Sequence, residues 1–131
     1  MDPQKEKIKD LIKLAKLHYR HKKYEKALEY FKEAAELGDP LAQYFTASMH
    51  DEARGTPLDY ARAAFWYGLA AEQGDPSAQC RLGQMYRDGE GVGKDSEKSL
   101  YWFTKAAEQG CLGAPPHLRT KYAKKKGQIL L

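Results

Sequence analysis

The glycine-rich segment 89–94 is the first candidate for chemistry, because glycine amides can cradle phosphates and a lysine closes the run. A Walker-type phosphate loop also needs a glycine at its start and a Ser or Thr after the lysine to bind magnesium. This chain has Asp88 and Asp95 at those two places, and no strand is predicted ahead of them. The segment therefore predicts a turn between helices and not a nucleotide site.

Histidines and cysteines, which could bind a metal or act as nucleophiles, are few and scattered. Among the four histidines only His18 and His21 have helical spacing, at i and i+3, and a lone pair does not make a zinc site. Cys80 is predicted in mid-helix with no histidine at predictable reach to activate it. With Cys111 it makes too few cysteines for a disulfide framework, so both are expected as free thiols. We expect no metal, no cofactor and no enzymatic activity.

A 36-residue repeat organises the chain. Gly-Asp-Pro-Leu-Ala-Gln at 38–43 returns as Gly-Asp-Pro-Ser-Ala-Gln at 74–79, and Ala-Ala-Glu begins at 34, 70 and 106. Such a period is typical of stacked helical hairpins, in which each unit buries its apolar face against its neighbours. We therefore expect any function to lie on a surface.

Apolar residues recur three and four positions apart within each unit, which predicts helices. The first helices are expected at 5 to about 21, 40 to about 53, 76 to about 88 and 115 to about 125, and the second helices at 24–37, 60–73 and 96–109. The second helices share a stripe of aromatic and small residues: Ala27, Tyr30, Phe31, Ala34; Ala63, Trp66, Tyr67, Ala70; and Ser99, Trp102, Phe103, Ala106. Large rings and small residues on one face predict close helix packing.

The junctions between units follow a stop and start rule. Gly38 suits a left-handed helix C-cap, Asp39 can cap the next helix, and Pro40 fits its first turn, where no amide partner is lost. The same three residue types recur 36 residues later. These tight junctions predict antiparallel neighbours and a curved stack.

Charge is concentrated at the C-terminal end. The chain has a net charge of +4, and its last 21 residues hold five basic side chains and no acid: Arg119, Lys121, Lys124, Lys125 and Lys126. The rest of the chain is close to neutral, which is weak evidence for a nucleic-acid-binding fold. No apolar leader and no run of about 18 apolar residues is present, so we expect no membrane span and a soluble, cytoplasmic protein.

Residues 78–110 closely resemble the SEL-one-like repeat (SLR). They contain Ala-Gln at 78–79, Leu-Gly at 82–83 with a tyrosine three on, Gly-x-Gly-Val at 89–92, an aromatic pair at 102–103 and Ala-Ala-x-x-Gly at 106–110. Residues 40–74 resemble a weaker copy, in which Thr-Ala replaces Leu-Gly and His50 takes the tyrosine place. The first unit, with a shorter loop, resembles the related tetratricopeptide repeat.

The resemblance implies an all-α fold, a right-handed superhelical α/α solenoid of about seven antiparallel helices within one domain, 1–131. We expect a tetratricopeptide-like hairpin at 8–39, SLR-like repeats at 40–74 and 75–110, and a degenerate half-repeat at 111–131 that serves as a capping helix with a basic tail. The alternative is that the chain is a truncated part of a longer array.

The resemblance also implies a non-enzymatic adaptor that binds a peptide or partner protein in a concave groove lined by the first helices. A basic groove with Tyr44 as an apolar anchor suits an acidic peptide or helix. The alternative is nucleic-acid or acidic-surface binding through the basic first helix and the tail. Alignment of the units predicts these groove residues: Lys9, Ile12, Lys13, Lys16, Tyr19, Arg20, Leu41, Tyr44, Ser48, Asp51, Arg81, Gln84 and Arg87.

Overall fold

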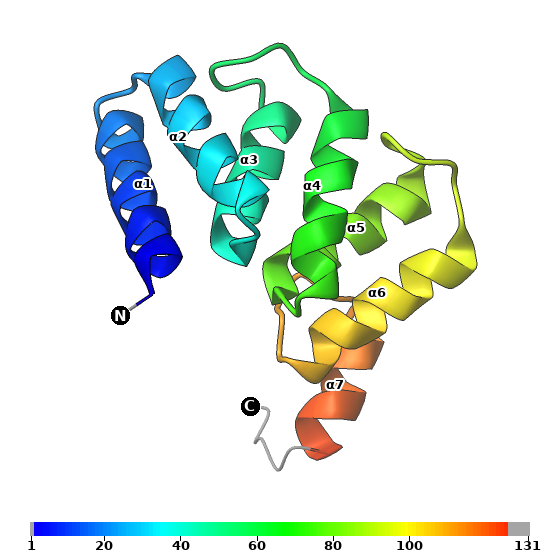
Figure 1. Ribbon diagram of the computed structural model, residues 1–131. Helices are drawn as coiled ribbons and strands as arrows, with labels where there is room; N and C mark the ends of the chain where they lie inside the picture. Colours follow the sequence, from blue (N-terminus) through cyan, green and yellow to red (C-terminus); the bar gives the residue numbers. More distant parts are fainter. Residues whose placement is uncertain (1, 126–131) are drawn as a thin grey trace.

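The computed structural model describes residues 2–125, and these form seven α-helices without a strand (Figure 1). The helices are α1 Pro3–Arg20, α2 Tyr24–Glu36, α3 Pro40–Asp51, α4 Tyr60–Glu72, α5 Pro76–Asp88, α6 Ser96–Glu108 and α7 Pro116–Lys125. Each packs against its neighbours along the chain, most extensively within the pairs α1 and α2, α3 and α4, and α5 and α6. The predicted all-α right-handed solenoid is confirmed. Lys126 of the expected basic tail lies outside the described residues, as do the side chains of Lys124 and Lys125.

Aspartate side chains begin the helices, as the junction pattern predicts. The Asp39 carboxylate accepts a hydrogen bond from the Ala42 amide at 2.8 Å, and Asp75 accepts one from Ala78 at 2.8 Å. Gly38, which follows α2, has a left-handed φ of 98°. Asp2, Asp59 and Asp95 cap three further helices in the same way. Local capping chemistry therefore fixes the helix boundaries.

Two boundaries differ from the prediction by two residues; in addition, α1, α2, α4 and α6 end one residue earlier and α7 begins one residue later than expected. The first helix begins at Pro3 and not at residue 5, because Asp2 caps it through the Gln4 amide at 3.0 Å. The third helix ends at Asp51 and not at residue 53, because Ala53 adopts a left-handed φ of 55°. That φ is incompatible with a right-handed helix, so the loop to α4 starts earlier.

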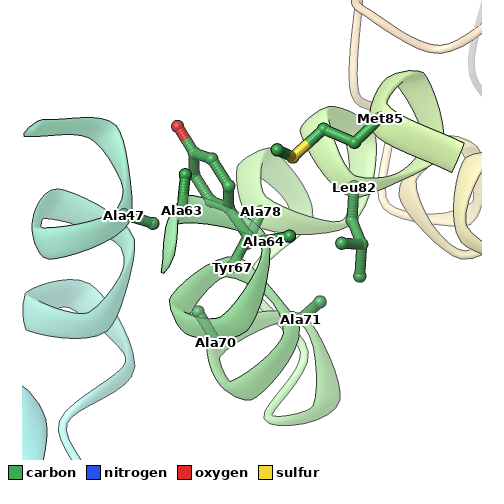
Figure 2. Packing of buried hydrophobic residues seen from close by; sticks show 9 residues of the cluster. All are labelled: Ala47, Ala63, Ala64, Tyr67, Ala70, Ala71, Ala78, Leu82 and Met85. Atoms are coloured by element: carbon green, nitrogen blue, oxygen red, sulfur yellow. The ribbon is translucent and has the colours of Figure 1, made fainter. Parts of the chain in front are cut away.

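The stripe of the second helices forms the core. Figure 2 shows the alanines of α4 next to Tyr67, with Leu82 and Met85 of α5 on the other side. Small residues let the helix backbones approach, and the large side chains fill the remaining space. In contrast to Phe31, Tyr67 and Phe103, which are buried, Tyr30, Trp66 and Trp102 are half-buried. The stripe of α4 contacts α3 of its own hairpin and α5 of the next hairpin in one cluster.

Glutamines tie the second and third hairpins to the junctions before them. Gln73, at the end of α4, donates to the Gln43 side-chain oxygen at 2.8 Å and to the Gly38 carbonyl at 2.9 Å. Gln109 repeats both bonds 36 residues later, to Gln79 and Gly74. The recurring Ala-Gln pair is thus part of a hydrogen-bonded ladder that holds the repeats in register.

The seventh helix packs against the end of the stack. Ala114 and Leu118 are buried with Phe103, Ala106 and Ala107 of α6 in one apolar cluster. Both cysteines are free thiols in the described structure, and burial, followed by the nearby Cys111, raises the pKa of Cys80 to about 12. A thiol with so high a pKa is a poor nucleophile.

Candidate protein-interaction groove

A groove of about 540 Å³ runs along α1 to the start of α3. Lysines form its rim and Ile8 and Ile12 form its apolar part. Because the lysines are three or four residues apart, they lie on one face of the helix. The residues that line the groove are Lys5, Ile8, Lys9, Ile12, Lys13, Lys16 and Asp39.

The lysines of this groove carry unneutralised charge. Lys5, Lys9, Lys13 and Lys16 are exposed, and none forms an ion pair within the described part of the chain. The structure thus brings Lys9, Lys13 and Lys16 together, as the alignment predicts. The alignment missed Lys5 and Ile8, although each lies four residues before a predicted groove residue and the spacing alone could have identified them.

Arg81, in contrast, is held by the protein itself. Its guanidinium donates to both carboxylate oxygens of Asp51 at 2.8 Å, and to Glu90 at 3.2 Å. The Tyr67 hydroxyl donates to the same Asp51 carboxylate at 2.9 Å. Two of the predicted groove residues, Asp51 and Arg81, therefore meet as partners of each other, so the groove is not strongly basic at the third unit.

The network also sets the ionisation of its members. Burial by itself raises the pKa of Asp51, but the hydrogen bonds from Arg81 and Tyr67 and the charge of Arg81 hold that pKa below its ordinary value. Burial, then the Asp51 carboxylate, raises the pKa of Tyr67. Asp51 is therefore a carboxylate and Tyr67 a neutral donor at neutral pH.

Among the remaining predicted residues of α3 and α5, Tyr44, Ser48 and Gln84 are half-buried, and Leu41 is 40% exposed. Tyr44 lies against the rings of Phe45 and Tyr67, with centroid distances of 5.6 and 5.7 Å. Ser48 donates to Glu52 at 3.3 Å, and Gln84 accepts a long bond of 3.5 Å from Arg81. Only part of the Tyr44 ring is left for a partner to contact.

Three other predicted residues lie apart from the groove. The Tyr19 hydroxyl accepts a bond of 2.7 Å from Arg54, so it is used within the fold. Arg87 is exposed and pairs with its neighbour Asp88 at 3.0 Å. Arg20 lines a different hollow, on the outer side of α1. Lysines of α1 therefore line the groove, whereas Tyr19, Arg20 and Arg87 lie outside its lining.

A larger hollow, of about 1000 Å³, lies beside the turn between α1 and α2. Its lining mixes lysines with Glu25 and Glu29, and Lys26 pairs with Glu29 at 3.5 Å. Size alone would favour this hollow, but its opposite charges partly neutralise each other. The groove along α1 is the better candidate because its lysines have no acidic partner among residues 2–125.

Among the described residues, no group of three or more His, Cys, Asp or Glu side chains could hold a metal ion. None of the helices in that part of the chain is long and apolar enough to cross a membrane.

Comparison with known proteins places these features in context. The Sel1-repeat family model matches residues 13–39, 40–75 and 76–111. The first match lies within the expected first hairpin, 8–39, and begins five residues later. The protective antigen c5321 of uropathogenic Escherichia coli, which displays an SLR fold, is 37% identical with a TM-score of 0.70; the match covers 78% of this chain but only 22% of that protein.

Two further solved structures are similar. A Sel1-repeat protein from Oxalobacter formigenes is 29% identical, with a TM-score of 0.74 over 89% of this chain and 88% of its own. Cysteine-rich protein B of Helicobacter pylori shares the fold at 23% identity, with a TM-score of 0.62 over 73% of this chain and 69% of its own. No curated protein sequence matches this chain.

Proposed function

Because this chain belongs to the Sel1-repeat family, we propose that it is a non-enzymatic adaptor that holds an acidic segment of a partner protein in the groove along α1. Sel1-repeat proteins are generally protein-interaction modules, and their fold is generally a scaffold without catalysis. The observation that carries the proposal is the unpaired row of lysines beside the two isoleucines, Ile8 and Ile12.

The spacing of the lysines defines the partner. Lys5, Lys9 and Lys13 are four residues apart, which corresponds to about 6 Å along the helix axis. Acidic residues at every second position of an extended peptide are about 6.7 Å apart, and at every fourth position of a helix about 6 Å apart. Either partner could place successive carboxylates near successive ammonium groups, with apolar side chains against Ile8 and Ile12.

Apolar contacts favour a peptide over a nucleic acid. The groove offers Ile8 and Ile12 beside the cations and no exposed ring in its lining on which a base could stack. Nucleic-acid binding through α1 and the basic tail remains the alternative. The two differ in salt dependence, because release of counterions from phosphates gives a steep loss of affinity with added salt.

The test measures binding of a fluorescent peptide that alternates glutamate and leucine. We expect the variant Lys9→Glu with Lys16→Glu to bind at least about tenfold more weakly than wild type. The matched control, Lys26→Glu with Lys32→Glu, makes the same charge change on exposed sites of α2. Equal weakening by both variants would show that only net charge matters, and tighter binding of a single-stranded oligonucleotide with a steep salt slope would favour the alternative.

A further inference from the structure

The outer face of α1 is exposed at positions that the next two repeats bury. Leu14 and Leu17 are 40% and 44% exposed. Aligned on the Leu-Ala and Thr-Ala motifs, Leu14 corresponds to Thr46 and Leu17 to Met49, which are 0% and 1% exposed. In the following repeat the same two positions are Leu82 and Met85, and both are buried.

A second helix of the preceding hairpin covers these positions in the later repeats. Met49 of α3 packs with Ala27 and Phe31 of α2. Leu82 and Met85 of α5 pack in the same manner against Ala63, Tyr67 and Ala70 of α4, as Figure 2 shows. The covering helix thus presents a small residue, an aromatic ring four positions on and a second small residue three positions later.

No element of the described structure covers the corresponding face of α1. A hollow of about 600 Å³ is present there instead, lined by Asp10, Lys13, Leu14, Leu17 and Arg20. Lys13 borders both this hollow and the groove, but Leu14 and Leu17 belong to the outer face alone. This outer face, defined by those five residues, is thus an unoccupied copy of the contact that joins successive repeats.

Charge indicates what kind of helix fits. Helix α1 has six basic and two acidic side chains, which give it a net charge of +4. The helix that covers the equivalent face of α3 is α2, which has four acidic and two basic side chains, a net charge of −2. A second copy of α1 would bring two strongly positive helices together, so self-association through this face is disfavoured.

We propose that the outer face of α1 docks an acidic amphipathic helix of a partner protein, stacked as the second helix of a preceding repeat would be. Its apolar stripe is small, aromatic, small at i, i+4 and i+7, and its flanks are acidic. This contact is distinct from the groove, so the protein has two binding surfaces that meet at Lys13.

The probe for this site is a synthetic peptide with the sequence of residues 23–37, the chain's own α2 with its stripe. A free peptide of this length is marginally helical, so it is made with a lactam bridge on the face opposite the stripe. It is labelled and titrated with the full chain. We expect saturable binding, weakened at least about tenfold when Phe31 of the peptide is replaced by Ala, because the ring fills the contact.

The protein variants locate the contact. Leu14→Glu with Leu17→Glu should weaken peptide binding at least about tenfold, because both carboxylates enter an apolar contact that faces an acidic helix. Leu58→Glu with Leu100→Glu alters two leucines of similar exposure elsewhere, 54% and 55%, and should change binding less than twofold. Circular dichroism confirms folding, and Leu14→Ser with Leu17→Ser repeats the test without new charge.

Other results would overturn the proposal. If the α2 peptide does not bind to folded wild type, or binds equally well to the Leu14/Leu17 variants, the outer face of α1 is not a docking site for such a helix. Wild-type dimers in sedimentation that dissociate in the Leu14/Leu17 variants would identify a second copy as the occupant. The groove variant Lys9→Glu with Lys16→Glu lowers the positive charge of α1 but keeps Leu14 and Leu17, so it should weaken binding of the α2 peptide less than the Leu14/Leu17 variants do. Failure of the groove proposal and failure of this one therefore give different results.

Discussion

Arg81 of α5 reaches back to Asp51 of α3 and forms two hydrogen bonds of 2.8 Å with its carboxylate. The two residues belong to successive repeats and are thirty positions apart in sequence. The Tyr67 hydroxyl completes the site from α4, between them in the stack. A pair that was predicted to contact a partner thus stabilises the junction between repeats.

The first prediction is that Asp51→Asn lowers the free energy of unfolding by about 2 kcal/mol. The substitution removes the negative charge that accepts two hydrogen bonds from the half-buried Arg81 cation, and leaves Glu90 as its remaining acidic partner. Urea unfolding followed by circular dichroism measures the change. The control is Asp88→Asn, whose partner Arg87 is exposed, and it should cost less than about 0.5 kcal/mol. Equal costs would show that Asp51 is no more important than a surface charge.

The Asp51–Arg81 pair also makes the free energy of unfolding depend on pH in the acid range. Because the folded pKa of Asp51 lies below its unfolded value, its contribution is complete above the unfolded pKa of about 3.9 and disappears as the pH falls through the folded pKa. We expect the stability difference between wild type and Asp51→Asn to shrink as pH is lowered below 4. A constant difference would contradict this linkage.

A second prediction concerns the glutamine ladder. Gln73→Leu removes the donor to Gln43 and to the Gly38 carbonyl, and we expect a loss of about 1 to 2 kcal/mol. Thermal unfolding measures it. The neighbouring Glu72 is exposed, so Glu72→Leu is the control and should leave the melting temperature within about 2 °C of wild type. Equal melting temperatures for the two variants would show that the glutamine hydrogen bonds do not contribute to stability.

The third prediction is a pH dependence that arises from His50. This side chain is 4% exposed, and its Nδ1 has no hydrogen-bond partner in the described structure. Burial, then the charge of Arg62, lowers its pKa below 6.5, so its neutral form is stabilised by folding. Its stabilising contribution is therefore complete above pH 6.5 and is lost as the pH falls from there toward the folded pKa.

His50→Phe should remove that loss, since Tyr86 shows that a ring fits the equivalent place in the next repeat. Between pH 7 and 5, wild type should lose up to about 1.4 kcal/mol per pH unit more than the variant. Denaturant unfolding at several pH values gives the slopes. The exposed His21→Asn is the matched control, because it leaves His50 in place, and a slope changed equally by both variants would contradict the assignment.

The fourth prediction tests the seventh helix. Leu118→Ala should cost about 2 to 4 kcal/mol, because Leu118 is buried against α6 and its truncation leaves a cavity. Differential scanning fluorimetry should show a lower melting temperature, and a dye that binds apolar surface should detect exposed α6. Leu112→Ala, at an 81% exposed site, is the control. An unchanged melting temperature would mean that α7 does not cap the stack.

Local sequence signals explain most of the fold. The Gly-Asp-Pro junctions act over a few residues, so they predicted the helix starts at Pro40 and Pro76 correctly. Ala53 shows their limit, because its left-handed backbone ended α3 early without a glycine to mark the site. The aromatic stripe could also be predicted from the sequence, because its spacing follows from helix geometry.

Ion pairs between side chains of different repeats could not be predicted from the sequence in the same way. Alignment placed Arg81 and Asp51 on the same surface, but whether a charge is neutralised depends on side chains thirty residues away. A groove variant that includes Arg81→Glu would therefore disturb the fold and the groove together. Leu14 and Leu17 were overlooked for a related reason: only the burial of Met49 and Leu82 shows that their face lacks its usual covering helix.

The most direct test of the groove is to map an acidic peptide on the ¹⁵N-labelled protein by NMR. The proposed function predicts that titration with the glutamate-leucine peptide shifts the amides of residues 5–16 and the start of α3. It also predicts that these shifts are lost in the folded variant Lys9→Glu with Lys16→Glu. Shifts that instead cluster on the exposed residues Phe65 and Tyr101 or on α7, and that persist in the variant, would contradict the central claim.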